Sequence, residues 1–313
     1  MRIVTAEETH RLLDYPSLVE ALRELFRRGV DRAERFALEQ PLPDGRRNDW
    51  LLLPAWQFGR HMGVKLVSVY PENQARGIDS VQGLYLLFDG TTGLPLAAID
   101  GAALTLRKTA ANSALAATWL AREDAGTLVM LGAGALGPHL VRAHCAVRPI
   151  RRVRIWNRTA ARAEAAAAEL RDELGLDVAP TADPEAAIRA ADIVSCATMA
   201  TEPLVKGAWL APGTHVDLVG GFREDMREAD DEAVRRARIF VDARFTATRA
   251  GDISQPLASG LVTDADIADS FELARGLKPG RRSPDEITLF KSGGGGHEDL
   301  GTAQHLMAKI SAA

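Results

Sequence analysis

The glycine-rich turn at Gly132, Gly134 and Gly137 constrains the fold of this chain more than any other segment. It follows an apolar run, Leu128–Leu131, that is typical of a buried parallel strand, and a helical pattern of apolar residues begins after it. In such a turn the first glycine makes the tight bend, the second lets the backbone approach a pyrophosphate, and the third lets the helix pack on the strand. Free N–H groups at the helix start favour phosphates. The motif therefore predicts a dinucleotide site; a tight turn without a ligand is the alternative.

The composition is that of a globular protein. The 313 residues, 46% hydrophobic and 26% charged, suit two domains of ordinary size. A net charge of -4 does not favour nucleic-acid binding, and no apolar run approaches the roughly 18 residues of a membrane span. The N-terminus lacks a secretory apolar segment. Cys145 and Cys196 lie in apolar segments without a second ligand motif, so we expect free thiols in the cytoplasm and no metal site.

The pattern changes along the chain. An amphipathic helix at 17–30 is followed by short strand-like runs with turn signals between them, which predicts a mostly antiparallel region. After an alanine-rich helix at 102–122, apolar strands alternate with helices, which predicts a doubly wound parallel sheet. The expected antiparallel strands are 50–53, 63–69, 83–88 and 95–99, and the expected parallel strands are 127–131, 153–156, 192–197, 215–219, 238–241 and 286–291. A last helix at 298–310 is expected to pack back on the N-terminal region.

The tip of the second parallel strand, Asn157, Arg158 and Thr159, bears on the choice of cofactor. An acidic residue there hydrogen-bonds the ribose 2′-hydroxyl of NAD, whereas an arginine accommodates the 2′-phosphate of NADP. This tip has no carboxylate, and Arg158 offers a fork of donors suited to a phosphate. The sequence therefore favours NADPH. NAD(H) is the alternative if Arg158 is an ordinary solvated side chain.

Several segments, in the same order, resemble the ornithine cyclodeaminase and mu-crystallin family. They are Val69–Asn73, Leu86–Gly90, Leu104–Ala111, the glycine turn, Trp156–Thr159, Cys196–Ala200, Val219–Phe222 and Ile287–Lys291. The resemblance implies a Rossmann domain at 119–292, inserted into a discontinuous α+β domain at 1–118 plus 293–313 that binds the substrate and forms a homodimer. The cofactor-binding residues it implies are Gly132, Gly134, Ala135, Leu136, Gly137, Asn157, Arg158, Thr159, Ala197, Thr198, Met199 and Thr109.

Three cations hold the substrate carboxylate in members of this family. The first is matched by Arg35, with Arg46 and Arg47 as competing matches, and the second by Lys65. The third is Lys108, where the family has an arginine; lysine keeps the charge but loses the bidentate fork. Lys65 also lies inside an apolar run, where an ammonium group needs a counter-ion that a bound carboxylate would supply. A strand lysine that points to water is the alternative.

Phe222 departs from the family pattern, because cyclodeaminases carry an aspartate directly after the paired glycines that precede it. A phenyl ring cannot accept a hydrogen bond from the δ-ammonium group of ornithine, but it can pack against an apolar ring. The nearby carboxylates Glu224, Asp225 and Glu228 fit a solvated loop better than a catalytic pair. The sequence therefore favours a substrate without a charged tail.

The resemblance implies NADPH-dependent reduction of 1-pyrroline-2-carboxylate or 1-piperideine-2-carboxylate to L-proline or L-pipecolate, with Lys65, Lys108 and Arg35 at the substrate. Ornithine cyclodeaminase with NAD is the first alternative. Alanine dehydrogenase and a mu-crystallin-like protein that binds NADPH and a ligand are the others. Glycines 293–296 leave room for a ligand such as the nicotinamide, and His297 after them is either structural or a proton donor.

Overall fold

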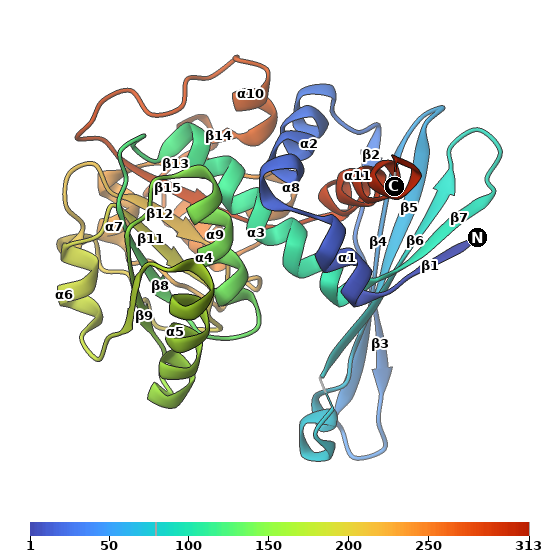
Figure 1. Cartoon of the computed structure of the whole chain (residues 1–313), viewed down its shortest axis with the longest axis horizontal. Coiled ribbons are helices and arrows are strands. Elements are labelled where there is room, and N and C mark those ends of the chain that lie inside the picture. The colour runs from blue at the N-terminus through green and yellow to red at the C-terminus, as the bar shows by residue number, and fades with distance from the viewer. Residues whose placement is uncertain (79, 313) are drawn as a thin grey trace. The chain divides into compact units, whose positions relative to one another are not determined.

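The computed structural model describes residues 1–78 and 80–312 and divides into two compact units (Figure 1). Unit 1 contains residues 1–108 and the segment from 295 onward, and unit 2 contains residues 109–294. The boundaries implied by the family resemblance lie after 118 and after 292, whereas those of the structure lie after 108 and after 294. The first differs more, because helix α3 (Gly101–Leu120) runs unbroken through both positions.

Unit 1 is built on a mixed sheet with strand order β1-β7-β6-β5-β4-β2, in which β3 also pairs with β4. The strands are β1 (Arg2–Val4), β2 (Arg32–Ala33), β3 (Phe36–Pro41), β4 (Arg47–Gln57), β5 (His61–Val69), β6 (Val81–Asp89) and β7 (Pro95–Asp100). The helices are α1 (Ala6–Leu12), α2 (Tyr15–Arg28) and α11 (Gly296–Ala312), with a 3-10 helix at Pro71–Arg76. Helix α11 packs on α2, β4 and β5, as expected for the last helix (Figure 1).

Local signals explain the ends of helix α2. The Asp14 side chain accepts a hydrogen bond from the Ser17 N–H at 2.9 Å, and Pro16 lies in the first turn, where its missing N–H costs nothing. Gly29 ends the helix with φ +84°, a conformation that favours glycine. The helix therefore begins two residues before the expected range of 17–30.

Alternation along β4, β5 and β6 gives the unit 1 sheet two faces. One face carries the buried side chains Ala55, Lys65, Tyr85 and Leu87. The other face carries apolar side chains that stay partly or largely exposed. Phe36, Leu52, Leu66 and Leu84 lie in register across β3, β4, β5 and β6 on this outer apolar face.

Unit 2 is a parallel sheet with strand order β10-β9-β8-β11-β12-β15-β13-β14. The strands are β8 (Thr127–Leu131), β9 (Arg152–Trp156), β10 (Asp177–Pro180), β11 (Ile193–Cys196), β12 (His215–Leu218), β13 (Ala237–Val241), β14 (Ile267–Asp269) and β15 (Ile287–Lys291). The helices are α4 (Leu136–Val147), α5 (Ala160–Leu174), α6 (Pro184–Arg189), α7 (Asp231–Arg236), α8 (Arg244–Ala247), α9 (Gly251–Ala258) and α10 (Ser270–Ala274), with 3-10 helices at Gly207–Trp209 and Asp264–Asp266. Helices α6 and α7 lie on one side of the sheet and α3 and α4 on the other (Figure 1).

The expected doubly wound fold is confirmed. The first five strands from β10 to β12 follow the 3-2-1-4-5 part of the 3-2-1-4-5-6 order of dinucleotide-binding sheets, and the sixth place is taken by the last strand, β15. The winding reverses between β8 and β11. The sequence patterns do not reveal β3, since every one of its side chains is exposed and no alternation marks it. They also miss the short strands β10 and β14. None of the described helices combines the length and apolar character needed to cross a bilayer.

Candidate active site

The glycine turn between β8 and α4 has two glycines that the packing of the protein itself requires. Gly132 has φ +108°, and a Cβ atom there would lie 2.5 Å from the carbonyl oxygen of Ala197. A Cβ atom on Gly137 would overlap the carbonyl oxygen of Gly132. Gly134 is different, because a Cβ atom there would meet no protein atom within 4 Å. The backbone at Gly134 is therefore open for a ligand to approach.

The start of helix α4 is also suited to an anion. Its N-cap residue, Ala135, makes no side-chain capping bond, so no side chain occupies the first N–H groups; that of Gly137 donates to the Gly134 carbonyl oxygen at 3.0 Å. Asn157 holds the turn in place: its Oδ1 accepts from the Ala133 N–H and its Nδ2 donates to the Thr159 carbonyl, both at 3.0 Å. These features fit the pyrophosphate of a dinucleotide.

The structure gathers most of the expected cofactor residues at one edge of the sheet. The glycine turn, 157–159 and 197–199 follow the carboxyl ends of β8, β9 and β11, which lie side by side in a parallel sheet. Arg158 and Met199 are exposed there, and Thr198 is partly buried. Thr109 is half-buried on α3, at the first position of unit 2.

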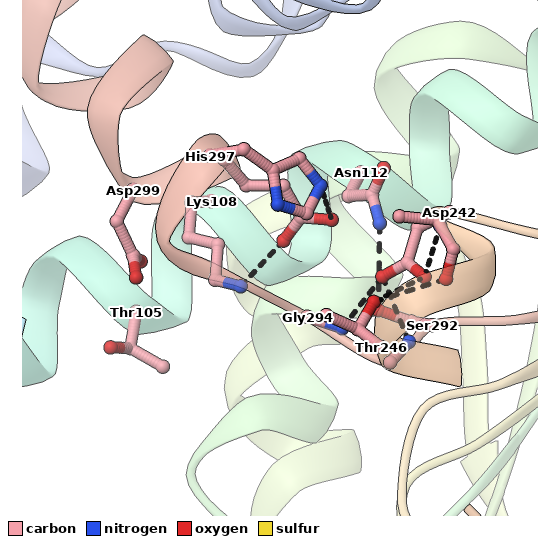
Figure 2. Close-up of polar contacts among 12 residues, drawn as sticks. Thr105, Lys108, Asn112, Asp242, Thr246, Ser292, Gly294, His297 and Asp299 are labelled. Atoms are coloured by element: carbon pink, nitrogen blue, oxygen red, sulfur yellow. Dashed lines mark hydrogen bonds and ion pairs between the residues drawn. The ribbon is translucent and has the colours of Figure 1, made fainter. Parts of the chain in front are cut away.

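The glycines at 293–296 serve the protein's own packing. A Cβ atom on Gly293 would lie 2.5 Å from the backbone nitrogen of Ala247, and one on Gly296 would lie 2.7 Å from the carbonyl oxygen of Leu53. Asp242, a buried residue after β13, accepts hydrogen bonds from the N–H groups of Gly293 and Gly294 at 2.8 and 2.6 Å (Figure 2). The run is therefore held by protein contacts, which the sequence pattern did not reveal.

Lys65 and Lys108 are both buried in unit 1, and each pairs with a carboxylate at the start of α11. The Lys65 ammonium group lies 2.9 Å from an Asp299 oxygen and 3.4 Å from the Thr105 hydroxyl oxygen. The Lys108 ammonium group lies 2.5 Å from Glu298 (Figure 2). Lys65 is 6% exposed and Lys108 3% exposed, so the expected alternative of a lysine that points to water is wrong.

Opposing effects act on the Lys65 ammonium group. Burial is the largest and lowers the pKa of Lys65; the Asp299 carboxylate raises it, and the charge of Lys108 lowers it again. Tyr85, directly opposite Lys65 on β6, is fully buried, and burial together with the Asp299 charge raises its pKa well above the ordinary value. Among the described residues its hydroxyl has no hydrogen-bond partner. Unit 1 thus holds a buried polar cluster of two cations, two carboxylates and a phenol.

The other expected site residues lie elsewhere. Arg35 is exposed in the link between β2 and β3. Its competitors are exposed in ion pairs, Arg46 with Asp44 and Glu72, and Arg47 with Glu39 and Asp49. Residues 1–78 and 80–312 contain no group of three or more His, Cys, Asp or Glu side chains arranged to hold a metal ion.

The titratable residues His297, Glu228, Cys145 and Cys196 lie in different surroundings. His297 is fully buried, its ring packs edge-on against Phe26 at 5.7 Å between centroids, and burial lowers its pKa. Glu228 was expected in a solvated loop with Glu224 and Asp225; those two are exposed, but Glu228 is fully buried, so the expectation is wrong for it. The free state expected for both cysteines is confirmed.

Sequence reasoning also missed Glu298 and Asp299. It sought the counter-ion of Lys65 only in a bound ligand. A signal was present, since two adjacent carboxylates precede apolar residues in the last helix. Charged side chains that are buried are almost always paired, so a buried lysine should direct attention to carboxylates in apolar segments anywhere in the chain.

The parallel sheet with its open glycine turn places the chain in the Rossmann class of dinucleotide-binding proteins. In the chain, the unit with this sheet is inserted into a second unit, which holds buried cations. The sequence model of the ornithine cyclodeaminase/mu-crystallin family matches residues 2–313, and the chain belongs to this family.

The chain is similar over most of its length to proteins with named activities. The chain is 42% identical over 288 residues to a Delta(1)-pyrroline-2-carboxylate reductase of Paracoccus denitrificans, covering 88% of this chain and 91% of that protein. A Delta(1)-pyrroline-2-carboxylate reductase of Thermococcus litoralis, solved with NADH and L-proline, has a TM-score of 0.91 at 31% identity, covering 100% of this chain and 98% of that one. An archaeal alanine dehydrogenase dimer with bound NAD has a TM-score of 0.89 at 28% identity, covering 100% and 96%.

The pairing of Lys65 with Asp299 predicts a large effect on stability. Asp299→Asn leaves a buried ammonium group without its carboxylate and should cost about 3–5 kcal/mol of unfolding free energy. The double variant Lys65→Met, Asp299→Leu should recover most of this loss, because apolar side chains of similar size can replace a buried pair. Urea unfolding of the three proteins measures the difference.

The exposed pair of Lys309 and Asp14, 2.8 Å apart, supplies the control. Lys309→Met should cost no more than about 1 kcal/mol, since water screens exposed pairs. Equal stability of Asp299→Asn and the unmodified protein would contradict the desolvated pair.

Proposed function

We propose that this protein uses NAD(P)H to reduce cyclic imino acids, 1-pyrroline-2-carboxylate or 1-piperideine-2-carboxylate, to L-proline or L-pipecolate. The observation that carries the proposal is the buried pair of ammonium groups, Lys65 and Lys108, in a chain that resembles named pyrroline-2-carboxylate reductases over most of its length.

Lys65 and Lys108 are suited to bind the substrate carboxylate. An ammonium group has three N–H donors, and Asp299 and Thr105 account for two of those of Lys65. The remaining donor would serve an anionic ligand. Asp299 also counteracts the effect of burial and so helps to keep Lys65 protonated. Because burial lowers the pKa of Lys65, this residue is our candidate for the proton donor to the imine nitrogen.

The glycine turn and the start of α4 would hold the pyrophosphate, and the loop of Thr198 would hold the nicotinamide half. When bound, the reduced nicotinamide supplies the hydride that the imine carbon accepts. The protein's part is to place the cofactor and keep the substrate imine cationic, since protonation makes its carbon a better acceptor.

Phe222 separates this proposal from the cyclodeaminase alternative. Its ring is 52% exposed in the loop after β12, and the guanidinium of Arg223 lies over it at 5.9 Å from the centroid. The δ-ammonium group of ornithine would find no carboxylate at this position, and an unpaired charge in a closed site costs several kcal/mol. A neutral cyclic imine avoids that cost.

The reaction itself is the first test. With NADPH, both cyclic imines should cause loss of nicotinamide absorbance, and L-ornithine with NAD should release little or no ammonia. Lys65→Met should lower kcat/KM by about 10–100-fold through loss of a charge-assisted contact, whereas Lys108→Arg, which restores the family's residue, should keep or improve it.

Phe222→Asp should weaken imine reduction. Because it places a carboxylate at this position, it is the variant to compare with the unmodified protein for turnover of L-ornithine. Conversion of L-ornithine to proline and ammonia by the unmodified protein would overturn the proposal. Reductive amination of pyruvate without imine reduction would identify an alanine dehydrogenase. Tight NADPH binding without any turnover would identify a binding protein.

Arg158 supports a preference for NADPH over NADH. It is exposed at the carboxyl edge of the sheet, two residues before the first residue of α5. Arg158→Ala should weaken NADPH binding by about 1.5–3 kcal/mol and leave NADH binding nearly unchanged, because only NADPH carries the 2′-phosphate. Titration of both cofactors measures this.

Arg282→Ala is the control for this variant, since Arg282 is exposed in the same unit but precedes β15 and so lies near the opposite edge of the sheet. Equal affinities for the two cofactors in the unmodified protein would mean that Arg158 does not read the phosphate. The solved relatives bind NADH and NAD, so a preference for NAD(H) is the competing outcome.

The outer apolar face of unit 1, defined by Phe36, Leu52, Leu66 and Leu84, supports a homodimer. Contiguous exposed apolar side chains of this kind mark association surfaces. Leu84→Glu should convert the dimer to a monomer in light scattering, because it places a charge within the interface. Phe58→Glu, at a position that is 89% exposed outside this face, should stay dimeric. A monomeric unmodified protein would contradict the proposal.

The cytoplasmic location of the protein is a prediction from its sequence.

A further inference from the structure

A second buried cluster lies in unit 2, apart from the lysines of unit 1. It consists of Lys291 at the end of β15, Asp252 in the first turn of α9, and Glu228 before α7, and all three are fully buried. The Lys291 ammonium group lies 3.1 Å from Asp252 and 3.9 Å from Glu228. Asp252 accepts hydrogen bonds from the N–H groups of Glu228 and Ala229 at 2.7 and 3.1 Å. The three side chains therefore form one network.

This network supports two loops at the carboxyl edge of the sheet. Glu228 accepts hydrogen bonds from both the N–H and the hydroxyl of Thr198, at 2.7 and 2.9 Å. Lys291 donates to the carbonyl oxygen of Gly220 at 2.7 Å. A Cβ atom on Gly221, which has φ +42°, would lie 3.0 Å from Asp252 and 3.5 Å from Lys291. The loops after β11 and β12 thus rest directly on the cluster.

The charges of the cluster do not balance. Two buried carboxylates face one buried ammonium group. Among the described residues, the titratable groups that affect the pKa of Glu228 are Lys291 of β15, Asp252 of α9 and the Cys196 thiol of β11. Burial raises the pKa of Glu228 to about 7; Lys291 opposes the rise and Asp252 adds to it. Burial also raises the pKa of Cys196 well above its ordinary value, so the thiol brings no charge of its own. A single proton on Glu228 makes the cluster neutral.

The location gives this proton a role. Strands β8 to β10 form one mononucleotide half of the sheet, and β11, β12 and β15 form the other, at whose carboxyl ends the nicotinamide half of a dinucleotide binds. We propose that Glu228, Asp252 and Lys291 are positioning residues for that half, and that one proton shared within the cluster keeps the loops of Thr198 and Gly220 in the arrangement that binds the cofactor. The inference rests on the cofactor part of the proposed function and not on the substrate.

The sign of the pH dependence follows from the charge count. The folded pKa of Glu228 lies above its ordinary value of 4.5, so the associated stability is present below 4.5 and is lost as the pH rises to about 7. Above that, two carboxylates share one cation and repel each other. If only the protein with a protonated Glu228 binds the cofactor well, the apparent affinity falls in proportion to the fraction of protein in that form.

Titration of the full-length protein with NADH tests the proposal. NADH is the probe because it lacks the 2′-phosphate, which itself titrates near neutral pH. The affinity should be about tenfold weaker at about pH 8 than at about pH 6. Glu228→Gln keeps an acceptor for Thr198 but cannot ionise, and its affinity should not change with pH. Glu224→Gln, an exposed neighbour, should retain the pH dependence.

Parallel pH profiles for Glu228→Gln and the unmodified protein would overturn the proposal. If Glu228→Gln does not fold, carbon-13 NMR of the glutamate carboxyl groups in the unmodified protein decides. A glutamate that titrates near neutral pH and shifts on NADH binding supports the proposal, and the absence of any such glutamate contradicts it. Neither readout uses an imino acid, so failure of the substrate assignment is distinguishable from failure here.

Discussion

The ion pairs at the start of helix α11 are the interaction on which unit 1 depends. Asp299 and Glu298 neutralise Lys65 and Lys108 inside the unit, and the same helix packs on α2, β4 and β5. Because the chain leaves this unit after residue 108 and returns at 295, these pairs tie its last segment to its first. Under the proposed function, the same two ammonium groups bind the substrate carboxylate. Closure of the unit and the chemistry of the candidate site therefore share the same side chains.

Unit 2 uses buried polar groups in a comparable way. Loops at its carboxyl edge are each held by a polar side chain: the partly buried Asn157 for the glycine turn, and the buried Glu228 for Thr198, Lys291 for Gly220 and Asp242 for the glycines after β15. A buried polar group is costly to leave without its hydrogen bond, so each of these bonds restricts the loop that it holds. Preorganised loops reduce the entropy lost when a cofactor binds.

The proposed substrate preference depends on the same loops. Phe222 lies in the loop that Lys291 holds, and its ring offers only apolar contact. Under the proposed function, Phe222 disfavours a charged substrate tail, while the buried lysines of unit 1 bind the carboxylate that amino and imino acids have in common.

The sequence by itself determined the dinucleotide-binding sheet and its glycine turn, since strand periodicity and the φ values available only to glycine are local properties. It also singled out Lys65 and Lys108. Only the tertiary structure decided what those lysines contact: Asp299 is 234 residues from Lys65 in the chain, and no local pattern links them. In the same way, the spacing of Glu228 fits a solvated loop, and its burial follows from α9 and β15 folding around it. Local patterns report on the next few side chains, whereas burial and charge pairing depend on segments that meet only in the fold.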